Sequence, residues 1–317
     1  MKAAILHGPR DLRVESSTRP EVRGDEVLVR VTVAGLCGTD YRIWSGDRPV
    51  AYPRGMGHEF VGRVVEPNYS CGTCPLCWEG NKNLCLARTA VGIDVDGCFA
   101  ELVRVPARCC WPAPAGVADE DLVLTEPLAV AVRAVGRADV RSGETVAVVG
   151  AGTLGLLAVQ VARGHGARIL VVSRTARRFA LARDLGAEAT HTVEDGPLDA
   201  RARAFSGREG VDCVIETAGA AEAVNHALAL VRPGGRIILT GLPHESTPVE
   251  FFSVVRREIT ILGSMIYQDE FSEAMRLVAD GTVKTRPLVS HRFPLDAIGD
   301  AFVTHAQPDS IKVALVI

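Results

Sequence analysis

Four of the nine cysteines lie within fifteen residues of one another, at a spacing typical of a metal site. They follow the pattern C-x2-C-x2-C-x7-C, formed by Cys71, Cys74, Cys77 and Cys85. Four thiolates so placed can fill a closed tetrahedral zinc shell with no open position, which is typical of a structural site. Cysteines at this spacing also suit an iron–sulfur cluster, and that alternative stays open. Unligated thiols at such density in a loop would be a liability, so zinc is our first assignment.

A second set of metal-ligating side chains is dispersed along the chain. Cys37 lies in GLCGTD, His58 and Glu59 lie in GMGHEF, and Glu126 lies in TEPLAV. One sulfur, one imidazole and one or two carboxylates make an incomplete zinc shell, which leaves a position for water or substrate. Taken singly, each residue has an ordinary structural interpretation, such as a core cysteine or a surface glutamate. Together they are a candidate catalytic site.

A glycine-rich motif predicts a nucleotide site. Gly150, Gly152 and Gly155 form G-A-G-T-L-G between an expected strand, TVAVVG, and an expected helix, TLGLLAVQVARGHG. The first glycine permits the tight turn, the second lets a pyrophosphate approach the backbone, and the third lets the helix pack on the strand. The predicted nucleotide-binding residues are Gly150, Gly152, Thr153, Leu154, Gly155, Ser173, Arg174, Arg178, Thr217 and Gly241.

The end of the next strand predicts which nucleotide is preferred. An acidic residue there would bind the ribose 2′-hydroxyl of NAD and repel a 2′-phosphate. The strand RILVVS ends instead at Ser173, which Arg174 follows. Serine can hydrogen-bond a phosphate and arginine pairs with it, so we expect NADP to be preferred over NAD. Arg177 and Arg178 have a competing interpretation as part of a solvated helix face.

These residues imply two kinds of structural element. From Met1 to about Val130, short β-like runs alternate with Gly, Pro and Asp, which predicts a twisted, mostly antiparallel barrel-like domain. From about Arg141 to Leu242, strands alternate with helices, which predicts a doubly wound parallel sheet of the Rossmann type in an α/β fold. We predict domains at 1–130 and 131–268, with 269–317 returning to the first domain.

Composition excludes several classes of function. The 317 residues are 47% hydrophobic and 23% charged, with a formal net charge of −3. This balance gives no electrostatic basis for binding nucleic acid or an anionic membrane surface. No apolar run approaches a membrane span, and the N-terminus is a poor signal peptide. We therefore expect a cytoplasmic protein without a disulfide framework.

The motifs together resemble a known family. GLCGTD, GHEF, the four-cysteine lobe, DGCFAELVRVP, TEPLAV, GAGTLG and the closing IKVAL occur in the order found in zinc-containing medium-chain alcohol dehydrogenases. The sorbitol, threonine and butanediol dehydrogenase branch is the most similar. The resemblance implies a GroES-like catalytic domain, with its structural zinc lobe at about 67–88, interrupted by a Rossmann domain. It also implies an active site between the two domains and a homodimer or homotetramer.

The resemblance also implies roles for single residues. Cys37, His58 and Glu59 match the catalytic zinc motif, and Glu126 matches a carboxylate that binds zinc directly or through water. Thr39 matches the hydroxyl that relays the substrate proton, and Asp40 resembles the residue that orients the zinc-binding histidine. The implied reaction is hydride transfer between a secondary alcohol, polyol or sugar alcohol and the nicotinamide, with zinc acting as a Lewis acid.

The sequence departs from the family pattern in two places, and two other functions compete. After Glu66 the family usually has a loop and a strand carrying G-D-x-V, whereas here Pro67 follows at once. Either the protein lacks that strand, which would weaken the barrel wall, or the sequence leaves out a segment. Cys98 replaces a usual glycine without an expected chemical consequence. The alternatives are a non-catalytic NADP-binding sensor or scaffold and a zinc-free quinone-type reductase. The complete set of candidate zinc ligands disfavours both.

Overall fold

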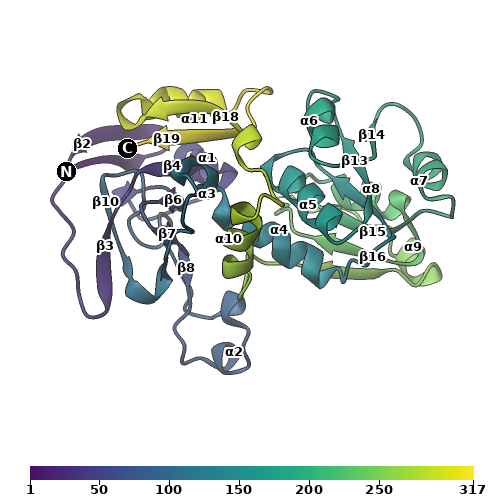
Figure 1. Ribbon diagram of the computed structural model, residues 1–317, viewed down its shortest axis with the longest axis horizontal. Coiled ribbons are helices and arrows are strands. Elements are labelled where there is room, and N and C mark those ends of the chain that lie inside the picture. The colour runs from purple at the N-terminus through teal and green to yellow at the C-terminus, as the bar shows by residue number, and fades with distance from the viewer. Residues whose placement is uncertain (244) are drawn as a thin grey trace. The chain divides into compact units, whose positions relative to one another are not determined.

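The chain folds into two compact units. The computed structural model describes residues 1–243 and 245–317 (Figure 1). Unit 1 comprises Met1–Glu126 together with Phe271–Ile317, and unit 2 comprises Pro127–Glu270. Unit 1 contains mostly antiparallel strands and unit 2 a six-stranded parallel sheet, so the predicted fold class is confirmed.

The sheet of unit 2 has the strand order β14-β13-β12-β15-β16-β17, and every neighbouring pair is parallel. The direction of winding therefore reverses between β12 and β15, and ligands of such sheets bind beyond the carboxyl ends of the strands at this point. The strands are β12 (Thr145–Val149), β13 (Arg168–Ser173), β14 (Ala189–Thr192), β15 (Val211–Glu216), β16 (Val231–Leu239) and β17 (Thr260–Gly263).

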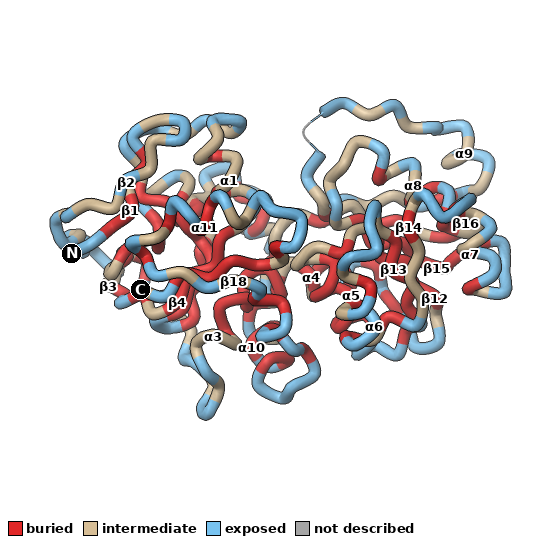
Figure 2. Tube along the Cα trace, turned by 90° about the horizontal axis from the view of Figure 1, so that it is seen from above, coloured by how far each residue is buried: buried red, intermediate tan, exposed pale blue. Residues whose placement is uncertain are grey.

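Helices cover the sheet of unit 2, which explains its uninterrupted apolar strands. All residues of β12 and β15 are buried, as Figure 2 shows for the centre of the sheet. Such runs are typical of parallel strands that are covered on both faces. The helix after β13 begins at Phe179, so Arg177 and Arg178 lie in the turn before it and are not part of a helix face. The helices are α4 (Thr125–Arg137), α5 (Thr153–Gly164), α6 (Phe179–Asp184), α7 (Leu198–Ser206), α8 (Ala223–Leu230) and α9 (Phe251–Arg256).

Unit 1 consists of small sheets around one core. Its largest sheet has the order β18-β19-β4-β6, with β4 (Val33–Leu36), β6 (Glu59–Val61), β18 (Val289–Pro294) and β19 (Lys312–Val316). The other strands are β1 (Lys2–Gly8), β2 (Asp11–Ser16), β3 (Glu26–Arg30), β5 (Arg54–Gly55), β7 (Val64–Val65), β8 (Asn68–Tyr69), β9 (Thr89–Ala90), β10 (Leu102–Pro106) and β11 (Cys110–Trp111). The helices are α1 (Gly38–Ser45), α2 (Pro75–Trp78), α3 (Asp119–Leu122), α10 (Phe271–Ala279) and α11 (Ile298–His305). Apolar side chains from many of these elements meet in one buried cluster that includes Leu36, Phe99 and Phe302.

The chain passes directly from β7 to β8 where the family pattern has a further loop and strand. Glu66 N–H donates to the carbonyl of Cys109 at 2.9 Å, and Val91 N–H donates to the carbonyl of Pro67 at 2.9 Å. These bonds satisfy the backbone at the short connection. In the described residues, no strand lies between β7 and β8.

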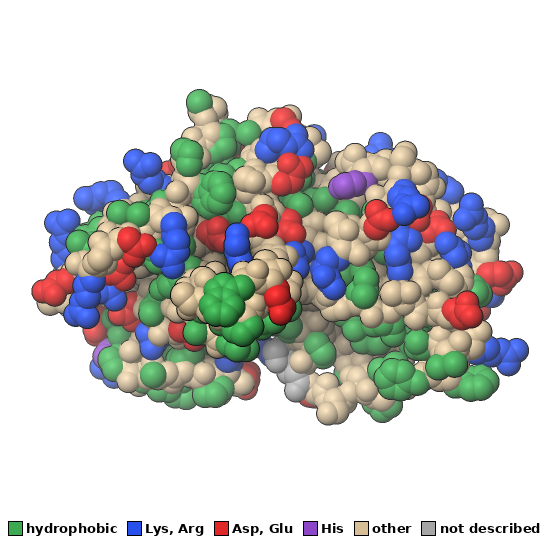
Figure 3. Space-filling view, turned by 90° about the horizontal axis from the view of Figure 1, so that it is seen from below, with side chains coloured by type: hydrophobic (Ala, Val, Ile, Leu, Met, Phe, Trp, Pro, Cys, Tyr) green, Lys and Arg blue, Asp and Glu red, His purple; other side chains and the backbone are tan. Residues whose placement is uncertain are grey.

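Two further features of the described residues are the distribution of charge on the surface and the length and apolar character of the helices. Figure 3 shows basic and acidic side chains interspersed on the face in view, without a continuous patch of one sign. None of the helices in the described part of the chain has the length and apolar character needed to cross a membrane.

Candidate functional site

Two neighbouring strands of unit 1 bring Cys37, His58 and Glu59 together. Cys37 follows β4, and Glu59 begins β6, which pairs with β4 so that Gly35 lies opposite Glu59. A side chain at position 35 would place its Cβ 2.4 Å from Glu59 Oε2, so only glycine leaves room for this carboxylate. The potential ligand atoms of the three residues all lie within 4.8 Å of one another.

Asp40 connects two members of this group. It lies in the first turn of α1 and is fully buried. Its Oδ2 accepts a hydrogen bond from Cys37 N–H at 2.9 Å, and its Oδ1 lies 3.2 Å from His58 Nδ1. Burial alone would lower the pKa of His58, but Asp40 and Cys37 outweigh it and raise that pKa well above the usual range. With Nδ1 facing Asp40, the imidazole keeps Nε2 for a ligand.

Lys312 is a residue of this site that the sequence analysis did not identify. Its Nζ donates to Glu59 Oε1 at 2.8 Å and to Oε2 at 2.6 Å, and both residues are buried. Burial would lower the pKa of Lys312, yet the adjacent Glu59 carboxylate raises it. The one signal in the sequence is that Lys312 begins the apolar run KVALV, which forms a strand whose first four residues are all buried. A lysine is rarely buried without a partner of opposite charge.

Glu126 and Thr39 are the other predicted catalytic residues, and neither belongs to the group of Cys37, His58 and Glu59. Glu126, in the first turn of α4, is buried but does not belong to the set of atoms within 4.8 Å. Burial raises the pKa of Glu126 to about 7, and the nearby His58 opposes that rise. Thr39 is half-buried in the first turn of α1, between Cys37 and Asp40 in sequence.

The chemistry of the three donors fits a zinc ion. A thiol, an imidazole and a carboxylate are the ligand types that zinc takes, and three protein ligands leave a fourth position for substrate or water. The group is also buried, apart from the half-buried Cys37, which keeps bulk water from competing with a substrate. Cys37, His58 and Glu59 are therefore the residues that could hold a catalytic metal.

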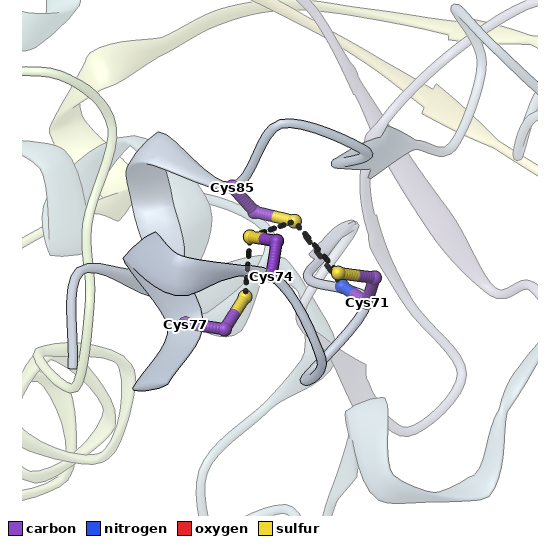
Figure 4. A group of neighbouring side chains, drawn as sticks. All are labelled: Cys71, Cys74, Cys77 and Cys85. Carbon is purple, nitrogen blue, oxygen red and sulfur yellow. Dashed lines mark hydrogen bonds between the residues drawn. The ribbon is translucent and has the colours of Figure 1, made fainter. Parts of the chain in front are cut away.

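The second cluster is formed by the four cysteines of the lobe (Figure 4). The sulfur of Cys74 lies 3.5 Å from that of Cys77 and 3.9 Å from that of Cys85, and the sulfurs of Cys85 and Cys71 are 3.5 Å apart. Zinc–sulfur bonds of about 2.3 Å in a tetrahedron separate the sulfurs by about 3.8 Å. The spacing thus fits a single tetrahedral ion, whereas an iron–sulfur cluster would place several atoms between the thiolates.

The surroundings of the lobe thiols shift their pKa values in opposite directions. Hydrogen bonds from Thr73 lower the pKa of Cys71 to about 6. Although the N–H of Cys71 opposes the change, burial and the neighbouring thiols raise the pKa of Cys85 to about 11. Four adjacent thiolates repel one another unless a metal ion compensates their charge. All nine cysteines of the chain are free of disulfide bonds.

The glycines of unit 2 have the conformations that their motif predicts. Gly150 directly follows β12 and has φ at +107°, a conformation that favours glycine. A Cβ on Gly155 would lie 2.0 Å from the carbonyl oxygen of Gly150, so α5 packs closely on the turn. A Cβ on Gly152 would meet nothing within 4 Å, which leaves this backbone open to a ligand. Thr153 and Leu154 begin α5.

The remaining nucleotide-binding candidates lie at the carboxyl ends of neighbouring strands. Ser173 is the half-buried last residue of β13, and Arg174 is exposed. Arg178 Nη1 donates to the carbonyl of Ala151 at 3.1 Å, which places its guanidinium beside the glycine turn. Thr217 follows β15 and donates to the carbonyl of Val149 at 2.9 Å. Gly241 follows β16, and a Cβ there would lie 2.2 Å from Gly219 N.

Comparisons with known proteins agree with this geometry. Residues 23–115 match the alcohol dehydrogenase GroES-like domain, and residues 153–280 match the zinc-binding dehydrogenase family. The sorbitol dehydrogenase of Bacillus subtilis is 32% identical over 327 residues, which cover 95% of this chain and 92% of that protein.

Two solved structures match the fold over the whole of this chain and 99% of their own. A protein of Sinorhizobium meliloti bound to NADP is 35% identical, with a TM-score of 0.94. An alcohol dehydrogenase (rspB) of Escherichia coli complexed with NADH is 29% identical, also with a TM-score of 0.94. The predicted family is confirmed, and with it the need for zinc and a nicotinamide cofactor. The chain belongs to the zinc-type medium-chain alcohol dehydrogenase family and is an oxidoreductase.

Proposed function

We propose that this protein oxidises a secondary alcohol, polyol or sugar alcohol with NADP, or catalyses the reverse reduction. The observation that carries the proposal is the buried group of Cys37, His58 and Glu59, whose ligand atoms lie within 4.8 Å of one another. The relatives of this chain include a sorbitol dehydrogenase and an L-galactonate-5-dehydrogenase, which supports a polyhydroxylated substrate.

In the proposed mechanism, Cys37, His58 and Glu59 hold the catalytic zinc. When bound there, the ion supplies Lewis-acid polarisation of the substrate oxygen. Asp40 fixes the orientation of His58 through the 3.2 Å contact with Nδ1. The hydroxyl of Thr39 accepts the substrate proton and passes it toward solvent. Glu126 lies outside the three-residue group, which supports an action through water.

The lobe holds a second zinc in this proposal, with a structural role. Cys71, Cys74, Cys77 and Cys85 fill all four positions of a tetrahedral site, so no substrate can bind there. The predicted domain boundaries at 130/131 and 268/269 remain predictions. We assign the catalytic function to unit 1 and nucleotide binding to unit 2.

NADP preference rests on Ser173 and Arg174. Arg174 is exposed, so its guanidinium is accessible to a 2′-phosphate. No carboxylate ends β13 to repel that phosphate.

We also propose that the chain forms a homodimer or homotetramer. β17 is an edge strand of the sheet, and α9 exposes 67% of Phe251, 70% of Phe252 and 77% of Val255. An unpaired edge beside exposed apolar side chains is typical of a surface that is covered by another chain. Light scattering during size-exclusion chromatography measures the assembly directly.

The proposed function is tested with zinc analysis and a panel of alcohols, polyols and sugar alcohols, each with NADP and with NAD. We expect two zinc ions per chain and turnover with NADP. In Cys37→Ser and His58→Ala, turnover should disappear while one zinc ion remains in the lobe. Near-normal turnover in folded His58→Ala would refute the site. Nucleotide binding without turnover of any panel member by the parent protein would favour the sensor or scaffold.

A further inference from the structure

Glu216 is a buried carboxylate at the switch point of the parallel sheet. It is the last residue of β15, directly opposite the last residue of β12, and only 2% of it is exposed. In the described part of the chain, the groups that bond to its carboxylate are backbone N–H groups, and no lysine, arginine or histidine is paired with it. A buried carboxylate without a cation is costly unless hydrogen bonds compensate its charge.

Backbone N–H groups provide that compensation. Glu216 Oε1 accepts hydrogen bonds from Ala218 N–H at 2.6 Å and from Gly219 N–H at 2.8 Å. The carboxylate therefore fixes the conformation of the loop that directly follows its own strand. Burial raises the pKa of Glu216, while the bonds from Gly219, Ala218 and Gly241 oppose that rise.

The same side chain also contacts the loop after the neighbouring strand. A Cβ on Gly241 would lie 2.7 Å from Glu216 Oε2 and 2.2 Å from Gly219 N. Gly241 N–H in turn donates to the main-chain carbonyl of Glu216 at 3.1 Å. The loops after β15 and β16 are thus held against each other around one carboxylate.

The residue after Glu216 extends this connection to the glycine turn. Thr217 Oγ1 donates to the carbonyl of Val149 at 2.9 Å. A Cβ on Gly150 would lie 2.7 Å from Thr217 Oγ1. Since Thr217 belongs to the loop that Glu216 holds, a change in the carboxylate alters the contact with Gly150. Three strand-end loops therefore depend on one buried side chain.

We propose that Glu216 is a positioning residue for the nicotinamide nucleotide, because it holds the loops after β15 and β16 in register with the glycine turn after β12. The inference rests on the proposed nucleotide site at this edge of the sheet. The carboxylate is suited to the role because it only accepts hydrogen bonds, and the groups around it donate. In Glu216→Gln, the amide oxygen can still accept from Ala218 and Gly219, but these bonds lose their charge assistance, and the amide nitrogen takes the place of Oε2 beside Gly241.

Asp212 provides a matched control at the opposite end of the same strand. It is buried and accepts hydrogen bonds from Thr145 N–H at 2.9 Å, from Thr145 Oγ1 at 2.8 Å and from Arg232 Nε at 2.8 Å. Asp212→Asn therefore removes a similar buried carboxylate, but far from the carboxyl ends of the strands. A general loss of stability in unit 2 would affect both variants.

The test measures dissociation constants for NADPH and NADH by fluorescence titration of the full-length holoenzyme, together with melting temperatures. We expect Glu216→Gln to raise the dissociation constant of the better nucleotide about tenfold, because the hydrogen bonds that hold the loop lose their charge assistance. The KM for the nucleotide should rise with it, while kcat at saturation stays within about twofold. Asp212→Asn should lower the melting temperature and leave the dissociation constant unchanged.

The outcomes separate the inference from the function on which it rests. If the parent binds neither nucleotide, the proposed function fails and the inference fails with it. If the parent binds but Glu216→Gln binds equally well, the inference alone is overturned. Equal weakening in Glu216→Gln and Asp212→Asn would also overturn it, because the effect would then be general. Should Glu216→Gln not fold, Glu216→Asp keeps the charge, shortens the reach and gives the same readout.

Discussion

Lys312 Nζ lies 2.6 and 2.8 Å from the two carboxylate oxygens of Glu59, so a proposed zinc ligand is already paired with a buried cation. The pair is almost completely excluded from solvent, with 5% of the lysine side chain and 1% of the glutamate side chain exposed. Without a metal ion, each buried charge is therefore compensated mainly by the other, and removal of either residue leaves an unpaired buried charge. We therefore expect the zinc content of the site to be coupled to the stability of unit 1.

Lys312→Met should destabilise the zinc-free protein more than the zinc-loaded protein. Without zinc, Glu59 would keep a buried charge with no cation, and breaking such a pair costs about 3–5 kcal/mol. With zinc, the ion compensates part of that charge. Urea unfolding of the parent and the variant, with zinc and with a chelator, measures the two differences. Glu59→Gln/Lys312→Met is the control and should recover stability in the chelator. Equal losses in both conditions would contradict the coupling.

Cys74→Ser should reduce stability and the zinc content together. Cys74 is close to two other sulfurs, at 3.5 and 3.9 Å, so its loss opens a closed site. Part of the metal-binding free energy is folding free energy, and it is lost with the ligand. We expect one zinc ion per chain and a lower melting temperature. Cys213→Ser, which alters a buried thiol of unit 2, is a control for the loss of a cysteine and should keep two zinc ions per chain. A Cys74→Ser protein with two zinc ions and the parental melting temperature would exclude a zinc site in the lobe.

Ser173→Asp/Arg174→Ala should reverse the nucleotide preference from NADP to NAD. The new carboxylate would bind the ribose hydroxyls and repel a 2′-phosphate, and the variant loses a charge-assisted hydrogen bond of about 1.5–3 kcal/mol. One such bond corresponds to roughly ten- to hundredfold in affinity. The ratio of kcat/KM for NADP and NAD, measured in parent and variant, gives the result. Arg177→Ala, on the adjacent exposed turn, should change the ratio little. A parent that prefers NAD would show that Ser173 and Arg174 do not recognise the phosphate.

Asp212 should contribute stability that disappears in acid. Burial alone would raise its pKa, but hydrogen bonds from Thr145 and Arg232 outweigh it and lower the pKa of Asp212 from 3.8 to about 2. Because the folded state holds the proton less tightly than the unfolded chain, the contribution is complete above about pH 4 and is lost as the pH falls toward 2. A shift of this size corresponds to roughly 2 kcal/mol. The difference in unfolding free energy between the parent and Asp212→Asn should shrink by that amount between pH 5 and pH 2. A constant difference over this range would contradict it.

The sequence was sufficient for the features that depend on local pattern. The uninterrupted apolar run of β12 and the glycines after it predict a buried strand and its turn, because both requirements lie within a few residues. The cysteine lobe is predictable for the same reason. The proposed grouping of Cys37 with His58 required the family resemblance, because it depends on the pairing of β4 with β6.

Long-range charge pairing was not predictable from pattern alone. Lys312 and Glu59 are separated by 253 residues, and no local periodicity relates them. The same holds for the contact between Glu216 and Gly241, because it depends on how two neighbouring strands end. The assignment of Arg177 and Arg178 to a helix face was wrong, because residues 174–178 adopt a turn in which Arg178 bonds to the carbonyl of Ala151.

The position of β19 has a consequence for the order in which the protein is made. β19 lies between β18 and β4, with Leu315 opposite Ala34 and Val313 opposite Leu36. During synthesis on the ribosome, β4 emerges long before its partner, and the whole of unit 2 is made in between. Unit 2 is continuous in sequence and can fold first. Unit 1 cannot complete its largest sheet, or pair Glu59 with Lys312, until residues 271–317 have been made. Lys312, the cation that pairs with Glu59, is therefore made as part of the same strand that completes the sheet.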